Sequence, residues 1–424
     1  MRNTNRRRMI QIATMAPLVL SSKSIYSSVN GRINHAVIGV GNQGQNHCQR
    51  FHSFSDHCQV VAVCDVDPKR RQKAARLVNI TQEKNIYGDY RKLLADPSID
   101  TVSIATPDHW HAKIAMEAML SGKHVYVEKP CCHNIHEGLQ LVQCAKQENK
   151  CIQHGTQSRS GEGVKKSMEF LQSGKLGEIR MAKAINHQLR KPIGIAKPES
   201  PPQGVNYDLW LGPAPVHAFT QNRWHYNWHW FWDYGTGDIG NDGTHQIDVA
   251  RWGLDVIQPS RVTGSGGQLF YQDDHQTPDT QTIIYEYNGV HLVYEMRLWT
   301  DYKLEGHDNG TVFYGDEGRL EIGRDGSHVI WKDGMREKLG GSGDLDANIK
   351  NFILSVKENN PKALNAPITE GFFSVALCHL GNISTRVQNQ LLVNSSNYEI
   401  TNDSSAAKLL GREYRKGYEL PKIG

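Results

Sequence analysis

A lysine and a histidine that lie far apart in this sequence are the side chains best suited to acid–base chemistry. Lys129 stands in the triplet Glu128-Lys129-Pro130, directly after the apolar run His124 to Val127. An ammonium group at the end of a strand can stabilise an alkoxide while a hydroxyl group is oxidised. His245 closes the stretch Gly240-Asn241-Asp242-Gly243-Thr244-His245, and imidazole is a natural base near neutral pH. The two residues predict removal of a hydroxyl proton coupled to the loss of hydride.

A glycine-rich turn indicates where the hydride goes. The apolar run His35 to Ile38 ends in Gly39-Val40-Gly41-Asn42-Gln43-Gly44, and a stretch of helical spacing follows. These glycines permit a tight turn and a close approach to a pyrophosphate, whose charge lies at the helix N-terminus. A second apolar run, Val60 to Cys64, ends in Asp65, whose carboxylate can accept hydrogen bonds from ribose hydroxyls. The combination predicts a dinucleotide site.

The same acid bears on which dinucleotide binds. A carboxylate at position 65 repels a 2′-phosphate, which favours NAD over NADP. Three cations follow closely, namely Lys69, Arg70 and Arg71. They would neutralise a phosphate if they turned inward, although a solvated helix face is the interpretation we favour. NAD is therefore the expected cofactor, and NADP is the less favoured one.

The elements that must position these groups alternate between strands and helices. A helix is predicted over 90–94, a buried strand over 101–105 before Thr106-Pro107, and a helix over 111–121. Ligands bind where the strands of a parallel sheet end. Beyond Arg261 the apolar residues alternate with period two, which predicts a largely antiparallel sheet containing strands over 281–287, 291–296, 311–315 and 319–322. Helices are predicted over 348–357 and 369–390.

These motifs resemble the Gfo/Idh/MocA family of NAD(P)-dependent sugar and inositol oxidoreductases. The resemblance extends from residue 33 to about residue 390 and rests on Gly39 to Gly44, Thr106-Pro107 with His109 to His111, Glu128-Lys129-Pro130, and Gly240 to Asp248. It implies an α/β fold with an N-terminal Rossmann domain and a C-terminal α/β domain built on a large open, mainly antiparallel sheet. We predict an export signal over 1–30, the Rossmann domain over 31–155, and a substrate-binding and oligomerisation domain over 156–424. Because such sheets pair face to face, a homodimer or homotetramer is expected.

The resemblance also implies roles for individual residues. The catalytic residues would be Lys129, which holds the substrate hydroxyl, and His245, which takes its proton. The cofactor-binding residues would be Gly39, Gly41, Asn42, Gln43, Gly44, Asp65, Thr106, Pro107, His109, His111, Glu128 and Lys129. The substrate-binding residues would be Lys129, Trp230, Asn241, Asp242 and His245.

Position 241 departs from the family pattern, which has an aspartate there. Asn241 can hydrogen-bond a sugar hydroxyl but cannot share a proton, and Asp242 points differently from the helix, so it does not replace the missing carboxylate. His245 and Lys129 must then carry more of the acid–base work. Asp248, one turn beyond His245, either orients the site or pairs with Arg251.

The stretch Trp224 to Tyr234 is dense in aromatic residues. Planar rings stack on the C–H faces of sugars, and other rings of this stretch must anchor the core. Two pairs of histidines, His225 with His229 and His109 with His111, have spacings compatible with a metal. No carboxylate or cysteine completes either ligand set, so no metal is expected.

The start of the chain resembles a twin-arginine export signal, with Arg6-Arg7-Arg8 before a short apolar stretch. We therefore expect a periplasmic or exported protein, the alternative being a disordered basic tail on a cytoplasmic enzyme. Across the whole chain 48 Lys and Arg face 44 Asp and Glu, and the excess lies in this first segment, so nucleic acid is not an expected partner. No apolar run is long enough to span a membrane. The eight cysteines do not suggest disulfides.

The sequence as a whole predicts an NAD(P)-dependent oxidoreductase acting on a carbohydrate CH–OH group. An exported enzyme that retained NADH would stall, which keeps open a redox-neutral glycosidase working through a keto-sugar. A non-catalytic sugar or nucleotide sensor is the remaining alternative, and Lys129 and His245 argue against it.

Overall fold

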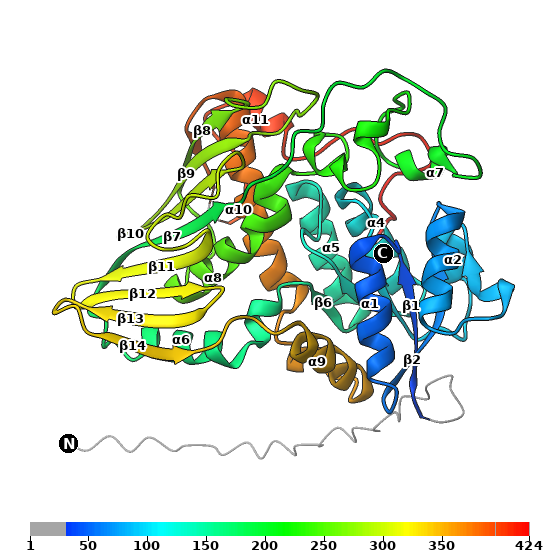
Figure 1. Cartoon of the computed structure of the whole chain (residues 1–424), viewed down its shortest axis with the longest axis horizontal. Coiled ribbons are helices and arrows are strands. Elements are labelled where there is room, and N and C mark those ends of the chain that lie inside the picture. The colour runs from blue at the N-terminus through cyan, green and yellow to red at the C-terminus, as the bar shows by residue number, and fades with distance from the viewer. Residues whose placement is uncertain (1–30, 395, 424) are drawn as a thin grey trace, which may run out of the picture.

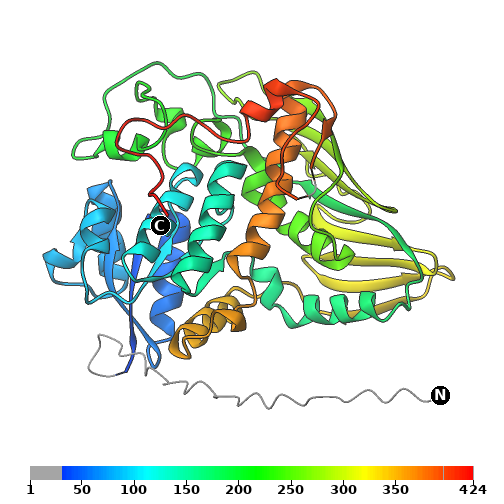
Figure 2. The same ribbon diagram turned by 180° about the vertical axis from the view of Figure 1, so that it is seen from behind.

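The computed structural model describes residues 31–394 and 396–423, which form two sheets with helices packed around them (Figures 1 and 2). The predicted export signal over 1–30 lies outside the described residues. The first sheet ends with β6 at His154 and the second begins with β7 at Ile179. The boundary at 155/156 falls between these two strands and stays a prediction.

The first sheet is parallel and has the strand order β3-β2-β1-β4-β5-β6, which is that of a dinucleotide-binding Rossmann fold. Its central strands are buried on both faces, as their continuous apolar runs require. The strands are β1 (Ile33–Ile38), β2 (Cys58–Cys64), β3 (Ile86–Tyr87), β4 (Thr101–Ile104), β5 (His124–Val127) and β6 (Ile152–His154). The helices between them are α1 (Asn42–Ser53), α2 (Pro68–Leu77), α3 (Tyr90–Leu94), α4 (Asp108–Leu120) and α5 (Ile135–Glu148).

The second sheet has nine strands in the order β14-β13-β12-β11-β7-β10-β9-β8-β15. All of its pairs are antiparallel except β10 with β7, so the predicted fold class is confirmed. The strands are β7 (Ile179–His187), β8 (Arg261–Gly267), β9 (Thr280–Tyr287), β10 (Val290–Arg297), β11 (Asn309–Gly315), β12 (Gly318–Gly323), β13 (Gly326–Trp331), β14 (Arg336–Gly340) and β15 (Leu391–Leu392). Helices α6 (Glu162–Gln172), α8 (Thr244–Leu254) and α10 (Ile368–Val387) pack against this sheet.

Helix α9 (Leu345–Lys357) returns from the second sheet to the first (Figure 1). Its Phe352 packs against Phe51 of α1 and Tyr126 of β5 with ring centroids 6.3 and 5.8 Å away, and the Tyr126 hydroxyl donates to Asn348 Oδ1 at 2.9 Å. This late segment of the chain therefore completes the hydrophobic core of the Rossmann domain.

The segment between β7 and α8 contains no strand and runs over one end of the first sheet, together with α7 (Tyr207–Leu211) (Figure 1). The short helix α11 (Ser404–Lys408) lies near the C-terminus. Within the described residues no helix combines the length and apolarity needed to cross a bilayer. All eight cysteines are buried and unpaired. The predicted homodimer or homotetramer stays a prediction.

Candidate active site

A cavity of about 660 Å³ lies where the strands of the first sheet end and helix α8 begins. It brings together residues from the glycine turn, the ends of β2, β4 and β5, the start of α8 and the aromatic segment. The predicted site residues in its wall are Gly39, Gly41, Asn42, Gln43, Asp65, Thr106, Pro107, His111, Glu128, Lys129, Asn241 and His245.

The glycine turn has the geometry that a dinucleotide requires. Gly39 has φ +80°, and a Cβ there would lie 2.7 Å from Thr106 N. A Cβ on Gly44 would lie 1.9 Å from Gly39 O, so Gly44 packs α1 against the turn and does not line the cavity. Gly41 caps α1 without a side-chain hydrogen bond, which leaves the N–H groups of the first turn available to an anion. These residues fit the pyrophosphate of NAD.

Asp65 is held in the cavity wall by two backbone donors. Its carboxylate accepts from Val40 N and from Asp67 N, each at 2.9 Å, while burial raises its pKa. A carboxylate oxygen has a second lone pair, so a ribose hydroxyl can still donate to it.

Arg70 differs from the expected solvated helix face. A Cβ on Gly41 would lie 2.5 Å from Arg70 Nη1, and the arginine side chain is part of the cavity wall. Arg71 turns to the Asp65 carbonyl at 3.2 Å, and only Lys69 is exposed. Which of the two arginines turns inward could not be predicted, because Arg70 and Arg71 are neighbours of the same residue type.

Glu128 connects the end of β5 to helix α1. It accepts from Gln43 Nε2 at 2.7 Å and from His47 Nε2 at 2.9 Å. Although burial acts in the opposite direction, these hydrogen bonds hold the pKa of Glu128 well below its usual value. Glu128 is therefore an ionised anchor of the cofactor side of the cavity.

The two histidines of α4 hold backbone groups. His111 lines the cavity, but its ring nitrogens face Pro130 O at 2.7 Å and Thr106 O at 2.8 Å. His109 faces Trp210 O at 3.1 Å and Tyr234 O at 3.3 Å, away from the cavity. Burial lowers the pKa of His109 to about 3 and that of His111 to about 4. His109, which was predicted to bind the cofactor, therefore does not line the cavity, because its ring fixes the aromatic segment to α4.

Lys129 reaches across the cavity to the start of α8. Its Nζ donates to Asn241 O at 2.5 Å and to Asn241 Oδ1 at 3.3 Å, and the Lys129-Pro130 peptide is cis. Over residues 31–394 and 396–423, no carboxylate forms an ion pair with this ammonium group. One of its three N–H groups is left for a ligand.

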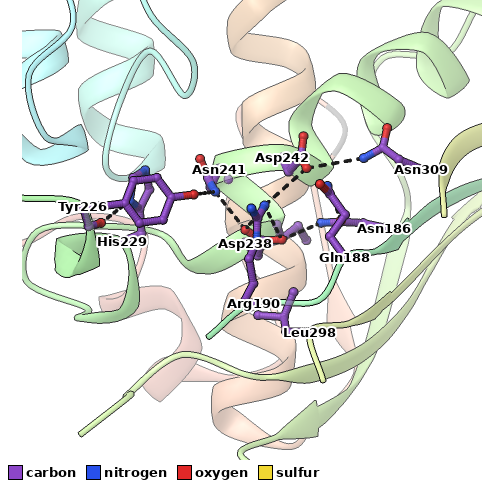
Figure 3. A network of polar contacts seen from close by, with 12 residues as sticks. Asn186, Gln188, Arg190, Tyr226, His229, Asp238, Asn241, Asp242, Leu298 and Asn309 are labelled. Atoms are coloured by element: carbon purple, nitrogen blue, oxygen red, sulfur yellow. Dashed lines mark hydrogen bonds and ion pairs between the residues drawn. The ribbon is translucent and has the colours of Figure 1, made fainter. Parts of the chain in front are cut away.

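Asn241 lies in the π-helical turn η5 (Ile239–Gly243), which precedes α8. Its Nδ2 donates to Asp238 Oδ1 at 2.8 Å and to the Tyr226 hydroxyl at 3.1 Å (Figure 3). Arg190 Nη2 contacts Asp238 Oδ1 at 2.9 Å and Asp242 Oδ2 at 3.3 Å (Figure 3). A carboxylate is therefore present behind Asn241, at position 238, which the sequence comparison with the family pattern did not reveal.

His245 lies one turn beyond Asn241 and is half-buried. Burial and the charge of Lys129 lower the pKa of His245 to about 3, so its ring is neutral. Its Nδ1 is buried and has no partner among the described residues. Asp248 does not pair with Arg251, as one expectation had it, but with Arg159 at 2.9 Å.

The aromatic segment from Trp224 to Tyr234 contributes five rings to the cavity wall, but not the ring of Trp230. Trp230, which was predicted to bind the substrate, is only 2% exposed and packs against His275 at 5.2 Å between ring centroids. It therefore lies in the core and not in the cavity wall. The rings of this segment in the cavity wall are Trp224, His225, Tyr226, Trp228 and His229. Residue type could not separate these rings from Trp230, since both sets are aromatic and adjacent. Gln157, also in the wall, carried no sequence signal.

The described residues contain no cluster of three or more His, Cys, Asp or Glu arranged to hold a metal.

Two family models match the chain. One, described as an oxidoreductase family with an NAD-binding Rossmann fold, matches residues 33–156. The other, described as the C-terminal alpha/beta domain of the oxidoreductase family, matches residues 193–420. Together they extend over most of the chain, which confirms the resemblance and the NAD-binding Rossmann fold of the N-terminal part.

Individual proteins show the same likeness. A glycosyl hydrolase family 109 protein from Shewanella pealeana is 31% identical over 160 residues, 36% of this chain and 35% of that protein. The chain spans less than half the length of the first curated relatives it matches. The WlbA dehydrogenase of Bordetella pertussis, in complex with NADH and UDP-GlcNAcA, matches with a TM-score of 0.65 and 18% identity, over 86% of this chain and 99% of that one. A levoglucosan dehydrogenase in complex with NADH and levoglucosan matches with a TM-score of 0.65 and 19% identity, over 85% and 99%.

Proposed function

We propose that this chain, which belongs to the Gfo/Idh/MocA family of NAD-binding oxidoreductases, oxidises a hydroxyl group of a neutral sugar. The observation that carries the proposal is that Lys129 and His245 line the same cavity as the glycine turn. NAD bound at that turn supplies an acceptor for the hydride of the carbinol carbon. The chain's own residues must then bind the sugar, orient its hydroxyl group and take the proton.

Lys129 orients and stabilises the reacting oxygen. Two of its N–H groups point to Asn241, and the third donates to the substrate oxygen. Because no carboxylate pairs with the ammonium group among the described residues, its charge acts on the negative charge that develops as the hydroxyl proton leaves.

His245 accepts that proton. Its pKa of about 3 keeps it unprotonated before the reaction, and the burial of Nδ1 leaves Nε2 as the accepting nitrogen. The charge of Lys129 helps to lower the pKa of His245. As the substrate oxygen becomes negative it offsets that charge, so the pKa of His245 rises while the proton moves to it.

The aromatic wall suits the sugar ring. Tyr226 is 43% exposed and its hydroxyl accepts from Asn241, while Trp228 stacks on His229 with centroids 3.6 Å apart. Such rings cover the apolar C–H face of a sugar while their polar edges bond its hydroxyl groups. Arg190, the further cation near Asn241, is neutralised by Asp238 and Asp242, which favours an uncharged sugar over a phosphorylated one.

A redox-neutral glycosidase is the second candidate, and the likeness to the glycosyl hydrolase family 109 protein favours it. Oxidation at one sugar carbon acidifies the neighbouring C–H. Loss of that proton then forms a C=C bond and expels the aglycone as an alcohol. Water then adds, and the hydride returns to the keto carbon. The same Lys129 and His245 would serve both oxidation and reduction.

Purified protein incubated with NAD, free sugars and nitrophenyl glycosides separates the two candidates. Accumulating NADH supports the dehydrogenase, and aglycone release without net NADH supports the glycosidase. Lys129→Met and His245→Gln should each slow either reaction by roughly 10²–10⁴-fold. The matched variants Lys183→Met and His379→Gln should not, since neither residue lines the cavity. Absence of both signals over the whole panel would refute the proposal.

A further inference from the structure

A second cavity of about 430 Å³ lies on the other side of His245. It shares Gln157 and His245 with the first cavity, so the two have a common wall. The other residues of the second cavity come from the turn before α6, α6 itself, η5, α8, the β11 and β12 strands and the loop before α9. They include Ser158, Asp242, Gln246, Asn309, Thr311 and Ser342. The second cavity therefore adjoins the space between Lys129 and His245.

The walls of the second cavity are rich in amides and hydroxyl groups. Gln246 is 7% exposed, and its Nε2 donates to Asn309 Oδ1. Its Oε1 is buried and has no partner among the described residues. Asn309 Nδ2 contacts Asp242 Oδ2 at 3.4 Å (Figure 3). A buried amide oxygen in a polar cavity requires a donor, and a hydroxyl group of a ligand would supply it.

The charges of this cavity are already paired. Asp242 contacts Arg190 at 3.3 Å. Arg324 is paired with Asp308 at 3.4 Å and donates to Gln188 Oε1 at 3.0 Å. Anionic groups such as a pyrophosphate are bound by unpaired cations, so the cavity is better suited to a neutral, polyhydroxylated group.

We infer that the second cavity is a subsite for a second sugar unit, so that the substrate is a neutral disaccharide or longer glycoside. This inference rests on the proposed function, because the first unit is the one oxidised between Lys129 and His245. Gln246 Oε1 accepts a hydroxyl hydrogen of the second unit, and Ser342, which is exposed at the rim, borders the same unit.

The test compares matched sugars: cellobiose with glucose, lactose with galactose, and chitobiose with N-acetylglucosamine. We expect at least one disaccharide to show a kcat/KM about tenfold or more above that of its monosaccharide. Gln246→Leu and Ser342→Trp should each lower this ratio roughly tenfold. Ser342→Trp acts at an exposed position and tests the subsite if Gln246→Leu does not fold.

Gln281→Leu is the matched control. Gln281 is also a buried glutamine with a partnerless Oε1 among the described residues, yet it lines neither cavity. Gln281→Leu should lower the free energy of unfolding without changing the ratio of disaccharide to monosaccharide kcat/KM. Equal kcat/KM values for every pair, or an equal fall for both members of a pair in Gln246→Leu, would overturn the subsite while leaving the sugar dehydrogenase intact.

If no sugar of the panel is oxidised, the proposed function fails, and calorimetric titration of the same pairs still tests the subsite. Disaccharide binding that is tighter than monosaccharide binding and is weakened by Ser342→Trp supports it. Equal binding of both members, or binding of UDP-glucose in preference to every neutral sugar, overturns it.

Discussion

Replacing Asn241 by aspartate introduces the residue that the family pattern has at this position, and we expect the change to destabilise the protein. Asn241 Nδ2 donates to Asp238 Oδ1 at 2.8 Å, so Asn241→Asp sets two carboxylates against each other. Burial already raises the pKa of Asp238. Two carboxylates in such contact do not both ionise, and the folded variant must therefore bind a proton.

The size of the effect follows from the pKa of this pair. In the unfolded chain both groups ionise near pH 3.9, and each pH unit between that value and the raised pKa costs about 1.4 kcal/mol. For two buried carboxylates in contact the total is on the order of 2–4 kcal/mol, because the charges of Arg190 and Lys129 offset part of the repulsion. The penalty is absent below the unfolded pKa, grows as the pH rises, and is constant above the pKa of the pair.

Urea unfolding at about pH 5 and about pH 8 measures the free energy of unfolding where the penalty is still small and where it is larger. We expect Asn241→Asp to lose more stability, relative to the original protein, at the higher pH. The double variant Asp238→Asn/Asn241→Asp exchanges amide and carboxylate and should recover most of the loss. An Asn241→Asp variant as stable as the original protein at the higher pH would refute the contact on which this reasoning rests.

Three further predictions concern the cavity. Lys129→Met should lower kcat by roughly 10²–10⁴-fold in the sugar oxidation assay, and Lys129→Arg should recover part of it, whereas a near-normal rate would remove the lysine from the chemistry. The kcat/KM for oxidation should not change between about pH 5 and pH 8 through titration of a histidine, because the pKa of His245 is lowered to about 3. A fall in kcat/KM near the ordinary histidine pKa that is absent in His245→Gln would contradict this. Asp65→Ala should raise the ratio of kcat/KM for NADP to kcat/KM for NAD about tenfold or more, because it removes the repulsion of a 2′-phosphate and leaves Arg70 beside Gly41. An unchanged ratio would contradict the inward orientation of Arg70.

The regular elements of the fold were predictable because their signals are local. The runs at 124–127 and 90–94 coincide with β5 and α3, and the period-two stretch at 281–287 is β9 apart from its first residue. A strand or helix that is apolar along one face identifies itself without knowledge of its partner.

The outward or inward direction of single side chains was not predictable, because long-range contacts decide it. Trp230 and Tyr226 are both aromatic and stand four residues apart, yet one is in the core and the other is in the cavity wall. His109 and His111 lie two residues apart on α4, and backbone carbonyls from three distant segments hold them. Arg70 likewise depends on the position of the glycine turn.

The amide at position 241 gives Lys129 a different electrostatic environment from the one a carboxylate would provide. Lys129 is held by two uncharged oxygens of Asn241. Asp238 lies behind the Asn241 side chain and is paired with Arg190, while Glu128 and Asp108 act on the charge of Lys129 without forming an ion pair with it. A carboxylate in direct contact would pair with the ammonium group and weaken its effect on a developing alkoxide.

Burial is the main cause of the low pKa of His245, and the charge of Lys129 lowers that pKa further. Asn241 thus favours a lysine whose charge is available to the substrate and a histidine that is ready to accept a proton. The aspartate of the family pattern would share the proton but neutralise the lysine. We therefore expect the double variant Asp238→Asn/Asn241→Asp, although folded, to oxidise its sugar more slowly than the original protein at neutral pH, and equal kcat values for the two would show that the charge of Lys129 is not what accelerates the reaction.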